Sequence, residues 1–242
     1  MTCKNCHTIF EGNFCNNCGQ SAQTHKLNAH FLWHDIQHGL FHFDQGMYYS
    51  AKELYLRPGH SIREFIEGKR VSHFKPISLV IVLATTYGLL YHSYDLNLFK
   101  TNGTEIPKPD QVLNNWMAQH YSWLTLATIP LYTLGTYVSF KSQGYNYIEL
   151  FVLNTFKASQ RLLLHIVTFP VVLHFNATPT IKTVMLWLYV LDIVLIYWTN
   201  FQFFNKLSKA KVLALSILSH LIFLAAFVIV FMAIVFLFGY SL

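Results

Sequence analysis

The stretch VLALSILSHLIFLAAFVIVFMAIVFLFGY, residues 212–240, contains no Lys, Arg, Asp or Glu side chain. A helix needs about 20 consecutive apolar residues to cross the roughly 30 Å hydrocarbon layer of a membrane. This stretch is longer than a straight crossing requires. We therefore expect a tilted transmembrane helix over residues 212–239.

Four further apolar runs of comparable length precede it, at residues 76–94, 121–140, 153–175 and 181–203. The first begins with Pro76, which suits the first turn of a helix because the N–H at that position has no partner within the helix. Of the 242 residues, 53% are hydrophobic and only 12% are charged, whereas roughly 25% are charged in soluble proteins. The sequence therefore predicts an all-α integral membrane protein with five transmembrane helices in residues 76–242.

The distribution of Lys and Arg predicts the orientation of these helices. Many basic residues precede the first span or follow the fourth, namely Arg57, Arg63, Lys69, Arg70, Lys75, Lys206, Lys209 and Lys211. Basic residues keep to the cytoplasmic side of a membrane. We therefore expect a cytoplasmic amino terminus and an external carboxyl terminus. We interpret the net charge of +6 as a sign of this topology and of attraction to anionic lipids, rather than of nucleic-acid binding.

The segment CKNCHTIFEGNFCNNCG, residues 3–19, holds all four cysteines, Cys3, Cys6, Cys15 and Cys18. Two C-x2-C motifs can bring four thiolates to a tetrahedral centre, each about 2.3 Å from Zn²⁺. Gly19 frees the backbone beside the second motif. Two disulfides are the alternative, which a cytosolic location disfavours. Residues 1–22 are therefore predicted to form a zinc ribbon, whose closed metal site is structural.

Zinc ribbons also serve as docking surfaces, so a protein partner is expected to bind here. Nucleic-acid binding needs a basic or aromatic face. Lys4 is the only Lys or Arg of the ribbon, so nucleic acid is not an expected ligand.

The segment HFLWHDIQHGLFH, residues 30–42, places histidines at a constant spacing of four, at His30, His34, His38 and His42. Asn28 can cap a helix over residues 29–43. Apolar side chains such as Trp33 and Leu40 fall opposite the histidines, which predicts an amphipathic helix. We expect this helix to lie at the cytoplasmic membrane surface, within a juxtamembrane region at residues 23–75.

Two interpretations of these histidines stay open. Imidazoles at positions i and i+4 can bind one metal ion, with Asp35 or Asp44 nearby as a third ligand, so a second metal ion is a candidate cofactor. The alternative is a polar or lipid-facing stripe without a metal. The HxxHH boxes of membrane-bound di-iron enzymes are absent, which argues against that chemistry.

The segment KELYLRPGHSIREFIEGKRVSHFKPI, residues 52–77, leads into the first span. Ser61 and Glu64 are spaced as a capping box for a short helix that ends at Gly68. Ile62, Phe65 and Ile66 would form the apolar face of this helix. The basic side chains are either a general anchor to anionic lipids or a specific site for lipid or substrate phosphate, formed by Arg57, Arg63, Lys69 and Arg70.

With its ribbon ending in CNNCGQ, its histidine helix and the segment RPGHSIREFIEGKRVSHFKPI, the chain resembles a bacterial family of integral membrane proteins that carry an N-terminal zinc ribbon. That family is catalogued as a domain of unknown function. The resemblance covers most of the chain and is most specific between Arg57 and Pro76. It implies a bacterial inner-membrane location and a ribbon followed by a helix bundle. It implies no catalytic assignment.

Charged residues also lie within the predicted spans. Lys157, Arg161 and His165 are four residues apart on one helix face, and Asp192 lies near the middle of the next span. A charge at this depth costs at least about 2.5 to 3.5 kcal/mol and faces a partner or a cavity. The short connection at residues 176–180 makes the two spans antiparallel neighbours. We therefore predict a buried cluster of Arg161, His165, Asp192 and His220, with Lys157 extending to the inner surface.

This cluster has two interpretations. It is either an ion pair that fixes the register of the helices or a site for a ligand, a proton or a lipid headgroup in a cytoplasm-facing cavity. Haem ligation by His165 and His220 is a weaker alternative, because one histidine on each of two helices is a common pattern.

Three functions therefore stay open. The first is a membrane-embedded assembly, regulatory or partner-binding protein, which fits the closed zinc site and the absence of nucleophile motifs. The second is a metal-dependent membrane enzyme that acts on a lipid or lipid-linked substrate. The third is a small transporter or channel built around Arg161 and Asp192, although the spans show no inverted repeat. Whether the chain is an enzyme and whether it forms a homo-oligomer also stay open.

Overall fold

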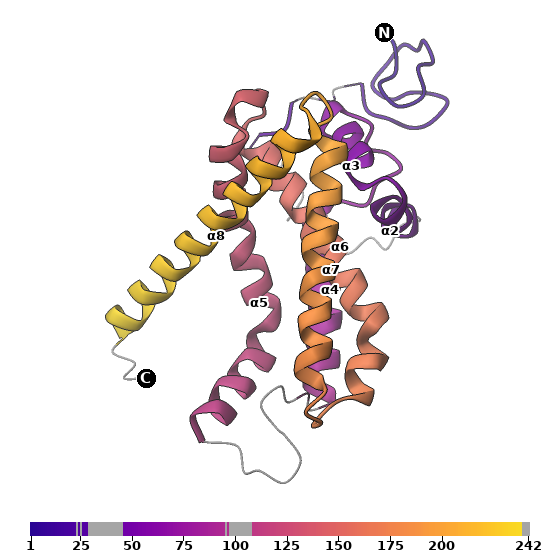
Figure 1. Cartoon of the computed structure of the whole chain (residues 1–242). Helices are drawn as coiled ribbons and strands as arrows, with labels where there is room; N and C mark the ends of the chain where they lie inside the picture. The colour runs from indigo at the N-terminus through magenta and orange to yellow at the C-terminus, as the bar shows by residue number, and fades with distance from the viewer. Residues whose placement is uncertain (23, 25, 29–45, 95, 97–107, 239–242) are drawn as a thin grey trace.

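A computed structural model of the chain describes residues 1–238, except 23, 25, 29–45, 95 and 97–107 (Figure 1). Over these residues the secondary structure consists of α-helices, one 3₁₀ helix and two isolated β-bridges in the ribbon. The helices are α2 (Gly46–Leu56), α3 (Pro58–Glu67), α4 (Pro76–Ser93), α5 (Lys108–Ser139), η1 (Lys141–Gln143), α6 (Tyr147–His174), α7 (Ile181–Phe203) and α8 (Lys209–Phe238). The prediction of an all-α protein is confirmed for this part of the chain.

The helices from α4 to α8 form a bundle in which consecutive helices run in opposite directions (Figure 1). The starts of α4, α6 and α8 and the ends of α5 and α7 lie at the same end of the bundle as the N-terminal ribbon. We call this the ribbon end. From there α8 diverges from α7 along its length, while α6 and α7 stay side by side (Figure 1).

Three of the described helices, α4, α7 and α8 as far as Ala233, are long and apolar enough to cross a membrane. The other two long helices, α5 and α6, also match predicted spans in position, but they carry more polar residues and begin earlier than predicted, at Lys108 and Tyr147. The bounds of α7 are those predicted from the sequence.

Large apolar side chains project outward from α7 and α8. Examples are Trp187, Val194, Val228 and Ile229, which are exposed to between 54% and 68% of their surface. A continuous apolar surface of this kind is rare on soluble monomers. Its position on two helices that are apolar enough to cross a membrane is consistent with a membrane protein.

The main core extends along the bundle from the ribbon end to the turn between α6 and α7. Phe140 and Phe204 stack with their ring centroids 3.8 Å apart and close the space between the ends of α5 and α7. Leu27, from the segment that follows the ribbon, is 1% exposed and belongs to the same core. The N-terminal segment is therefore packed into the bundle rather than attached by a free linker.

The predicted capping box at Ser61 and Glu64 is wrong. The helix α3 begins earlier, at Pro58, because proline suits its first turn, and this places Ser61 and Glu64 inside the helix. The predicted end is confirmed, since Gly68 follows the last turn with φ of 120°. The predicted apolar face is also confirmed, because Ile62, Phe65 and Ile66 are buried.

Candidate functional sites: a four-cysteine centre and a cationic cavity

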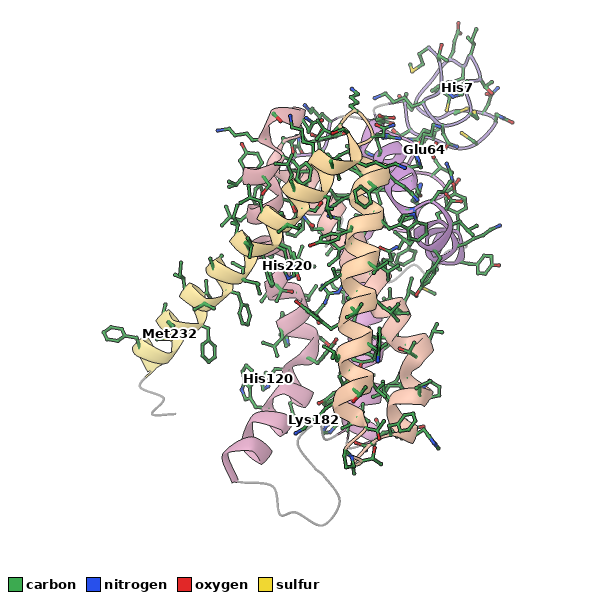
Figure 2. The ribbon with its side chains drawn as sticks, in the orientation of Figure 1. His7, Glu64, His120, Lys182, His220 and Met232 are labelled. Atoms are coloured by element: carbon green, nitrogen blue, oxygen red, sulfur yellow. The ribbon has the colours of Figure 1, made fainter. Side chains whose placement is uncertain are left out.

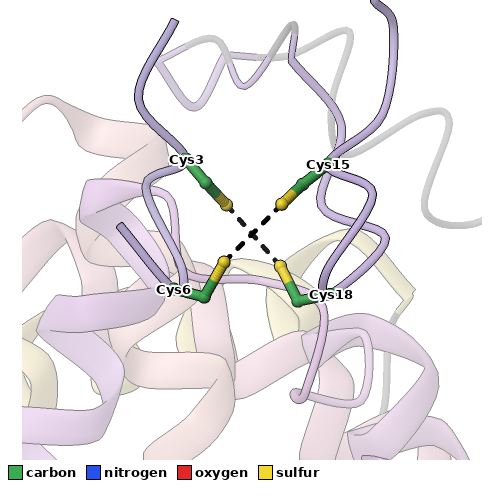
Figure 3. A group of neighbouring side chains, drawn as sticks. All are labelled: Cys3, Cys6, Cys15 and Cys18. Atoms are coloured by element: carbon green, nitrogen blue, oxygen red, sulfur yellow. Dashed lines mark hydrogen bonds between the residues drawn. The ribbon is translucent and has the colours of Figure 1, made fainter. Parts of the chain in front are cut away.

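The sulfur atoms of Cys3, Cys6, Cys15 and Cys18 lie within 4.8 Å of one another and point to one centre (Figure 3). The Sγ atoms of Cys3 and Cys18 are 3.6 Å apart, as are those of Cys6 and Cys15. Four thiolates at about 2.3 Å from one Zn²⁺ would be separated by about 3.8 Å in a tetrahedron. The four residues therefore fit a tetrahedral metal ion of this size, and they are not joined as disulfides.

The two C-x2-C motifs fold in the same way. The N–H of His7 donates to the carbonyl of Cys3 at 3.0 Å, and the N–H of Gly19 donates to the carbonyl of Cys15 at 2.8 Å. Both His7 and Gly19 adopt left-handed backbone conformations, with φ of 61° and 73°. The predicted need for backbone freedom at Gly19 is confirmed, whereas the same requirement at His7 was not recognised.

The side chain of Thr8 supports the centre. Its hydroxyl lies 3.3 Å from Sγ of Cys6. Hydrogen bonds to the side chain and backbone of Thr8 lower the pKa of the Cys6 thiol to about 5. This thiol therefore loses its proton readily, and the resulting thiolate is the form that binds a metal.

The ribbon is fastened to the helices by a buried glutamine. Gln20 is 4% exposed, and its Oε1 accepts from the N–H groups of Arg70 at 3.1 Å and Val71 at 3.3 Å. The segment after the ribbon makes a second contact, in which Asn146 Nδ2 at the start of α6 donates to the carbonyl of Leu27 at 3.1 Å. The ribbon therefore contacts the segment before α4, and the segment after the ribbon contacts the N-cap of α6.

The four basic residues predicted to bind lipid or phosphate make internal contacts. Arg57 and Lys69 both pair with Glu64, at 3.2 and 3.3 Å. Burial raises the pKa of the Glu64 carboxyl, but hydrogen bonds and charges from Arg57 and Lys69 outweigh it, so the pKa is lowered. The Nε of Arg70 donates to the carbonyl of Phe65 at 3.2 Å. Phosphate binding by these residues stays a prediction.

Arg63 caps the end of α7. Its Nη1 donates to the carbonyls of Gln202 at 3.2 Å and Phe203 at 3.1 Å, where the helix leaves carbonyl groups without partners. Arg63 therefore joins α3 to the last turn of α7. The candidate second metal site at His30, His34, His38 and His42 lies outside the described residues.

The structure brings together three of the four residues of the predicted intramembrane cluster. The Nε2 of His165 on α6 lies 3.0 and 3.2 Å from the carboxylate oxygens of Asp192 on α7. The Nε of Arg161 lies 3.4 Å from Oδ2 of the same carboxylate, and Asp192 is only 6% exposed. The fourth residue, His220 on α8, instead bonds to the hydroxyl of Tyr189 at 3.2 Å (Figure 2).

A cavity of about 260 Å³ lies between α5, α6, α7 and α8, and Arg161, His165 and His220 all line it. Lys157 lines it as well. The prediction that Lys157 extends to the inner surface is wrong, because this side chain is buried between the helices and its Nζ donates to Oδ1 of Asn154 at 3.3 Å. Lys157 lies on the face of α6 that lines the cavity, and its side chain stays within the bundle.

Several other polar residues of the cavity were not predicted from the sequence, namely Thr136, Asn154, Asn200, Ser216 and Ser219. One signal could have found Asn154, because it precedes Lys157 by three residues and so shares its helix face. The same signal applies in α8, where Ser216 precedes His220 by four residues and Ser219 by three residues. Thr136 and Asn200 are isolated polar residues in α5 and α7. Only the packing of the bundle shows that they face the same space. Together these groups can hold a small polar ligand by charge and by hydrogen bonds.

Comparison with known proteins gives one match within the chain. Residues 44–88, which comprise α2, α3 and most of α4, match the family described as "Protein of unknown function (DUF3667)". No curated protein and no solved structure matches the chain. The matched segment contains the helices that join the ribbon to the bundle, so the similarity concerns this junction.

Proposed function

We propose that the chain is a multi-pass protein of a bacterial inner membrane, with five spans formed by α4 to α8. The lengths of α5 and α6 and their positions beside α4 and α7 support crossings by these two helices as well. Their polar side chains line an internal cavity, which explains why composition alone favours only three spans. The ribbon end carries the basic residues of the junction and is assigned to the cytoplasm.

In this membrane the protein acts as a regulatory or assembly protein rather than as an enzyme. The observation that carries this proposal is the buried contact of Gln20 with the N–H groups of Arg70 and Val71. Gln20 is also part of the ribbon itself, because its carbonyl accepts from the N–H of Cys15 at 2.9 Å. A change in the metal centre therefore reaches the segment before α4 directly.

The contacts continue from this segment into the bundle. Arg63 and Gly59 on α3 both bond to Gln202 at the end of α7, through its carbonyl and its side chain. On α6, Gln160 donates to the carbonyl of Leu54 in α2 at 2.7 Å and accepts from Thr199 of α7 at 3.0 Å. The metal, when bound, supplies the crosslink that keeps the ribbon folded. The ribbon thereby sets the packing of α3, α6 and α7, and a cytoplasmic partner that binds the ribbon acts on the bundle by this route.

Hydrogen–deuterium exchange of the full chain in lipid nanodiscs tests this coupling. Removing the metal with a chelator is expected to increase exchange in the ribbon and also at residues 68–71 and in the first turn of α6. Gln20→Ala should produce the same increase at residues 68–71 with the metal still bound, because it removes the acceptor of the two N–H groups.

Asn16→Ala is the matched control, because Asn16 is an exposed amide on the same ribbon. This variant should exchange as the wild type does. An increase in exchange that stays within residues 1–22 after chelation would contradict the coupling.

The orientation has a separate test. The variants Ser142→Cys and Lys182→Cys place a thiol on exposed residues at opposite ends of the bundle. In whole cells an impermeant maleimide is expected to label Lys182→Cys from outside, and Ser142→Cys only after lysis. Labelling of both variants from the same side would contradict the assignment of five spans.

A further inference from the structure

The cavity between α5, α6, α7 and α8 is unusual in its charges. Among the described residues its walls contain two cations, Lys157 and Arg161, and two histidines, His165 and His220, but no carboxylate. Asp192 is not one of the lining residues, although it pairs with Arg161 and His165, which are. The free space of the cavity is therefore bordered by positive charge.

Lys157 is the residue that this arrangement leaves without compensation. It is 5% exposed, and no ion pair joins it to a carboxylate among the described residues. Its Nζ bonds to the side chain of Asn154, a neutral acceptor. An ammonium group with one neutral acceptor in a buried site is costly unless an anion or water completes its surroundings. Lys157 lines the cavity, so the cavity offers space for such an anion beside it.

Arg161 is held beside Lys157 in a fixed position. Asp192 contacts its Nε, and the ring of Tyr132 lies 5.9 Å from the guanidinium carbon. These two contacts orient the guanidinium group from the protein side. A guanidinium with a fixed plane can donate two parallel hydrogen bonds to the oxygens of a phosphate.

The polar groups of the cavity lie along its length. Asn154, Lys157 and Ser216 lie within about 15 Å of the ribbon end, at a rise of about 1.5 Å per residue. Arg161 and His165 lie about 20 Å or more from it, as does Leu124. The cations Lys157 and Arg161 are therefore one helical turn apart on the same wall of the cavity.

The side chain of Asn200 adds unused hydrogen-bonding capacity. Its Nδ2 donates to Oγ of Ser216 at 2.9 Å, while its Oδ1 is buried with no hydrogen-bond partner among the described residues. Unpaired buried acceptors are rare in proteins and call for an explanation. A protonated phosphate oxygen is a donor that would satisfy this atom.

We propose that this cavity binds a phosphate group, with Lys157 and Arg161 holding its charge and Asn200 and Ser216 completing its hydrogen bonds. This site is separate from the ribbon contacts that support the regulatory role. The volume of about 260 Å³ holds inorganic phosphate or the phosphate and glycerol of a lipid headgroup, and is too small for a whole lipid. The shared chemistry is the phosphate, and the two sources are distinguished by experiment.

The experiment uses the full chain in phosphatidylcholine nanodiscs. One arm adds phosphatidic acid and measures the lipid retained on the protein by native mass spectrometry. The other arm adds inorganic phosphate and measures the rise in melting temperature that accompanies ligand binding. Retention of phosphatidic acid over phosphatidylcholine supports the lipid source, and a rise in melting temperature with inorganic phosphate supports the free ion.

Lys157→Met should weaken whichever phosphate binds by about tenfold or more, because a charged hydrogen bond is lost. Without phosphate, this variant should melt at the same temperature as the wild type or higher, since it removes an uncompensated charge. Lys182→Met is the matched control, because Lys182 is exposed on α7 and lies far from the ribbon end (Figure 2). It should bind as the wild type does.

The proposal is overturned if wild-type protein neither retains phosphatidic acid over phosphatidylcholine nor melts higher with inorganic phosphate. It is also overturned if Lys157→Met and Lys182→Met bind phosphate equally well. The first criterion needs no variant and so holds even if Lys157→Met fails to fold.

Discussion

The bundle has two polar regions, the ribbon-end seam and the cavity. They differ in how completely the hydrogen bonds and charges of their polar groups are satisfied. In the seam, formed by Leu54, Gly59, Gln160, Thr199 and Gln202, the amide of Gln160 has a donor and an acceptor partner. The N–H of Gly59 bonds to the side chain of Gln202 at 3.1 Å. In the cavity Lys157 lacks an anion and Asn200 Oδ1 lacks a donor.

This difference in hydrogen bonding distinguishes polar groups that stabilise the fold from polar groups that are available to bind a ligand. A buried network stabilises a fold when each of its members is satisfied, and it destabilises the fold when members are left unpaired. The seam meets the first condition, so its role is to fasten α2, α3, α6 and α7. The cavity meets the second among the described residues, and a bound phosphate would supply the missing partners.

The largest effect is expected at the ion pair of Arg161 and Asp192 beside the cavity. Asp192→Ala removes the buried carboxylate and leaves the partly exposed guanidinium of Arg161 without its partner, which should cost about 3 to 4 kcal/mol. The melting temperature in nanodiscs should fall accordingly. The double variant Arg161→Met with Asp192→Leu should recover most of the loss. A single variant that melts as the wild type does would show that this pair does not stabilise the bundle.

In the seam the strongest effect is expected at Gly59. A Cβ atom at this position would lie 2.4 Å from the carbonyl oxygen of Thr199 and from the N–H nitrogen of Phe203, both of them backbone atoms of α7. Since neither can move independently, Gly59→Ala should separate α3 from α7 and cost about 3 kcal/mol.

Gly88→Ala is the matched control for Gly59→Ala. Its Cβ would approach the side-chain oxygen of Ser122 at 3.0 Å, and a side chain can rotate away. Thermal melting of both variants measures how much more Gly59→Ala destabilises the protein than Gly88→Ala does. Equal melting temperatures would mean that α3 and α7 approach less closely than the structure indicates.

The sequence predicts the individual helices better than the contacts between them. Residues 181–203 form an uninterrupted apolar run, and α7 begins and ends with it. The start of α5 was missed because the polar residues after Lys108 extend the helix beyond the apolar run at 121–140. At α3, Pro58 begins the helix one turn before Ser61, so local capping propensity gave the wrong start.

For the candidate sites, too, the sequence predicts residues on one helix face better than it predicts contacts between distant helices. The spacing of four residues between Arg161 and His165, together with a short turn between α6 and α7, was sufficient to predict that both meet Asp192. Lys157 was misplaced, because the length of its side chain allows it to reach the surface and only the packing of other helices prevents this. The cavity itself depends on α5 and α8, whose positions no local pattern predicts.

The aromatic core at the ribbon end should also respond to acid, through His73. The imidazole packs against Phe65 and Tyr49, and burial lowers its pKa to about 4. The neutral form is therefore the folded form, so the contribution of His73 is complete above pH of about 6.5 and is lost as the pH falls toward 4. At pH 5 the expected loss is about 2 kcal/mol.

Thermal melting of wild type and His73→Phe between pH 8 and 5 isolates this contribution, since the phenyl ring keeps the packing and cannot take up a proton. The wild type should lose more stability than the variant over this range. If the two proteins lose the same amount, His73 is not buried in its neutral form.

The smallest effect compares one hydroxyl from each region. Thr199→Val removes the donor to Oε1 of Gln160 in the fully packed seam and should cost about 1 to 2 kcal/mol, because that acceptor then has no replacement. Ser216→Ala removes the hydroxyl that accepts from Asn200, but Asn200 faces a cavity in which water can take its place, so the cost should stay below about 0.5 kcal/mol. The two melting temperatures give the comparison directly. If Ser216→Ala is the more destabilising change, the hydrogen bonds of the cavity stabilise the fold as much as those of the seam do. The cavity would then not differ from the seam in its role.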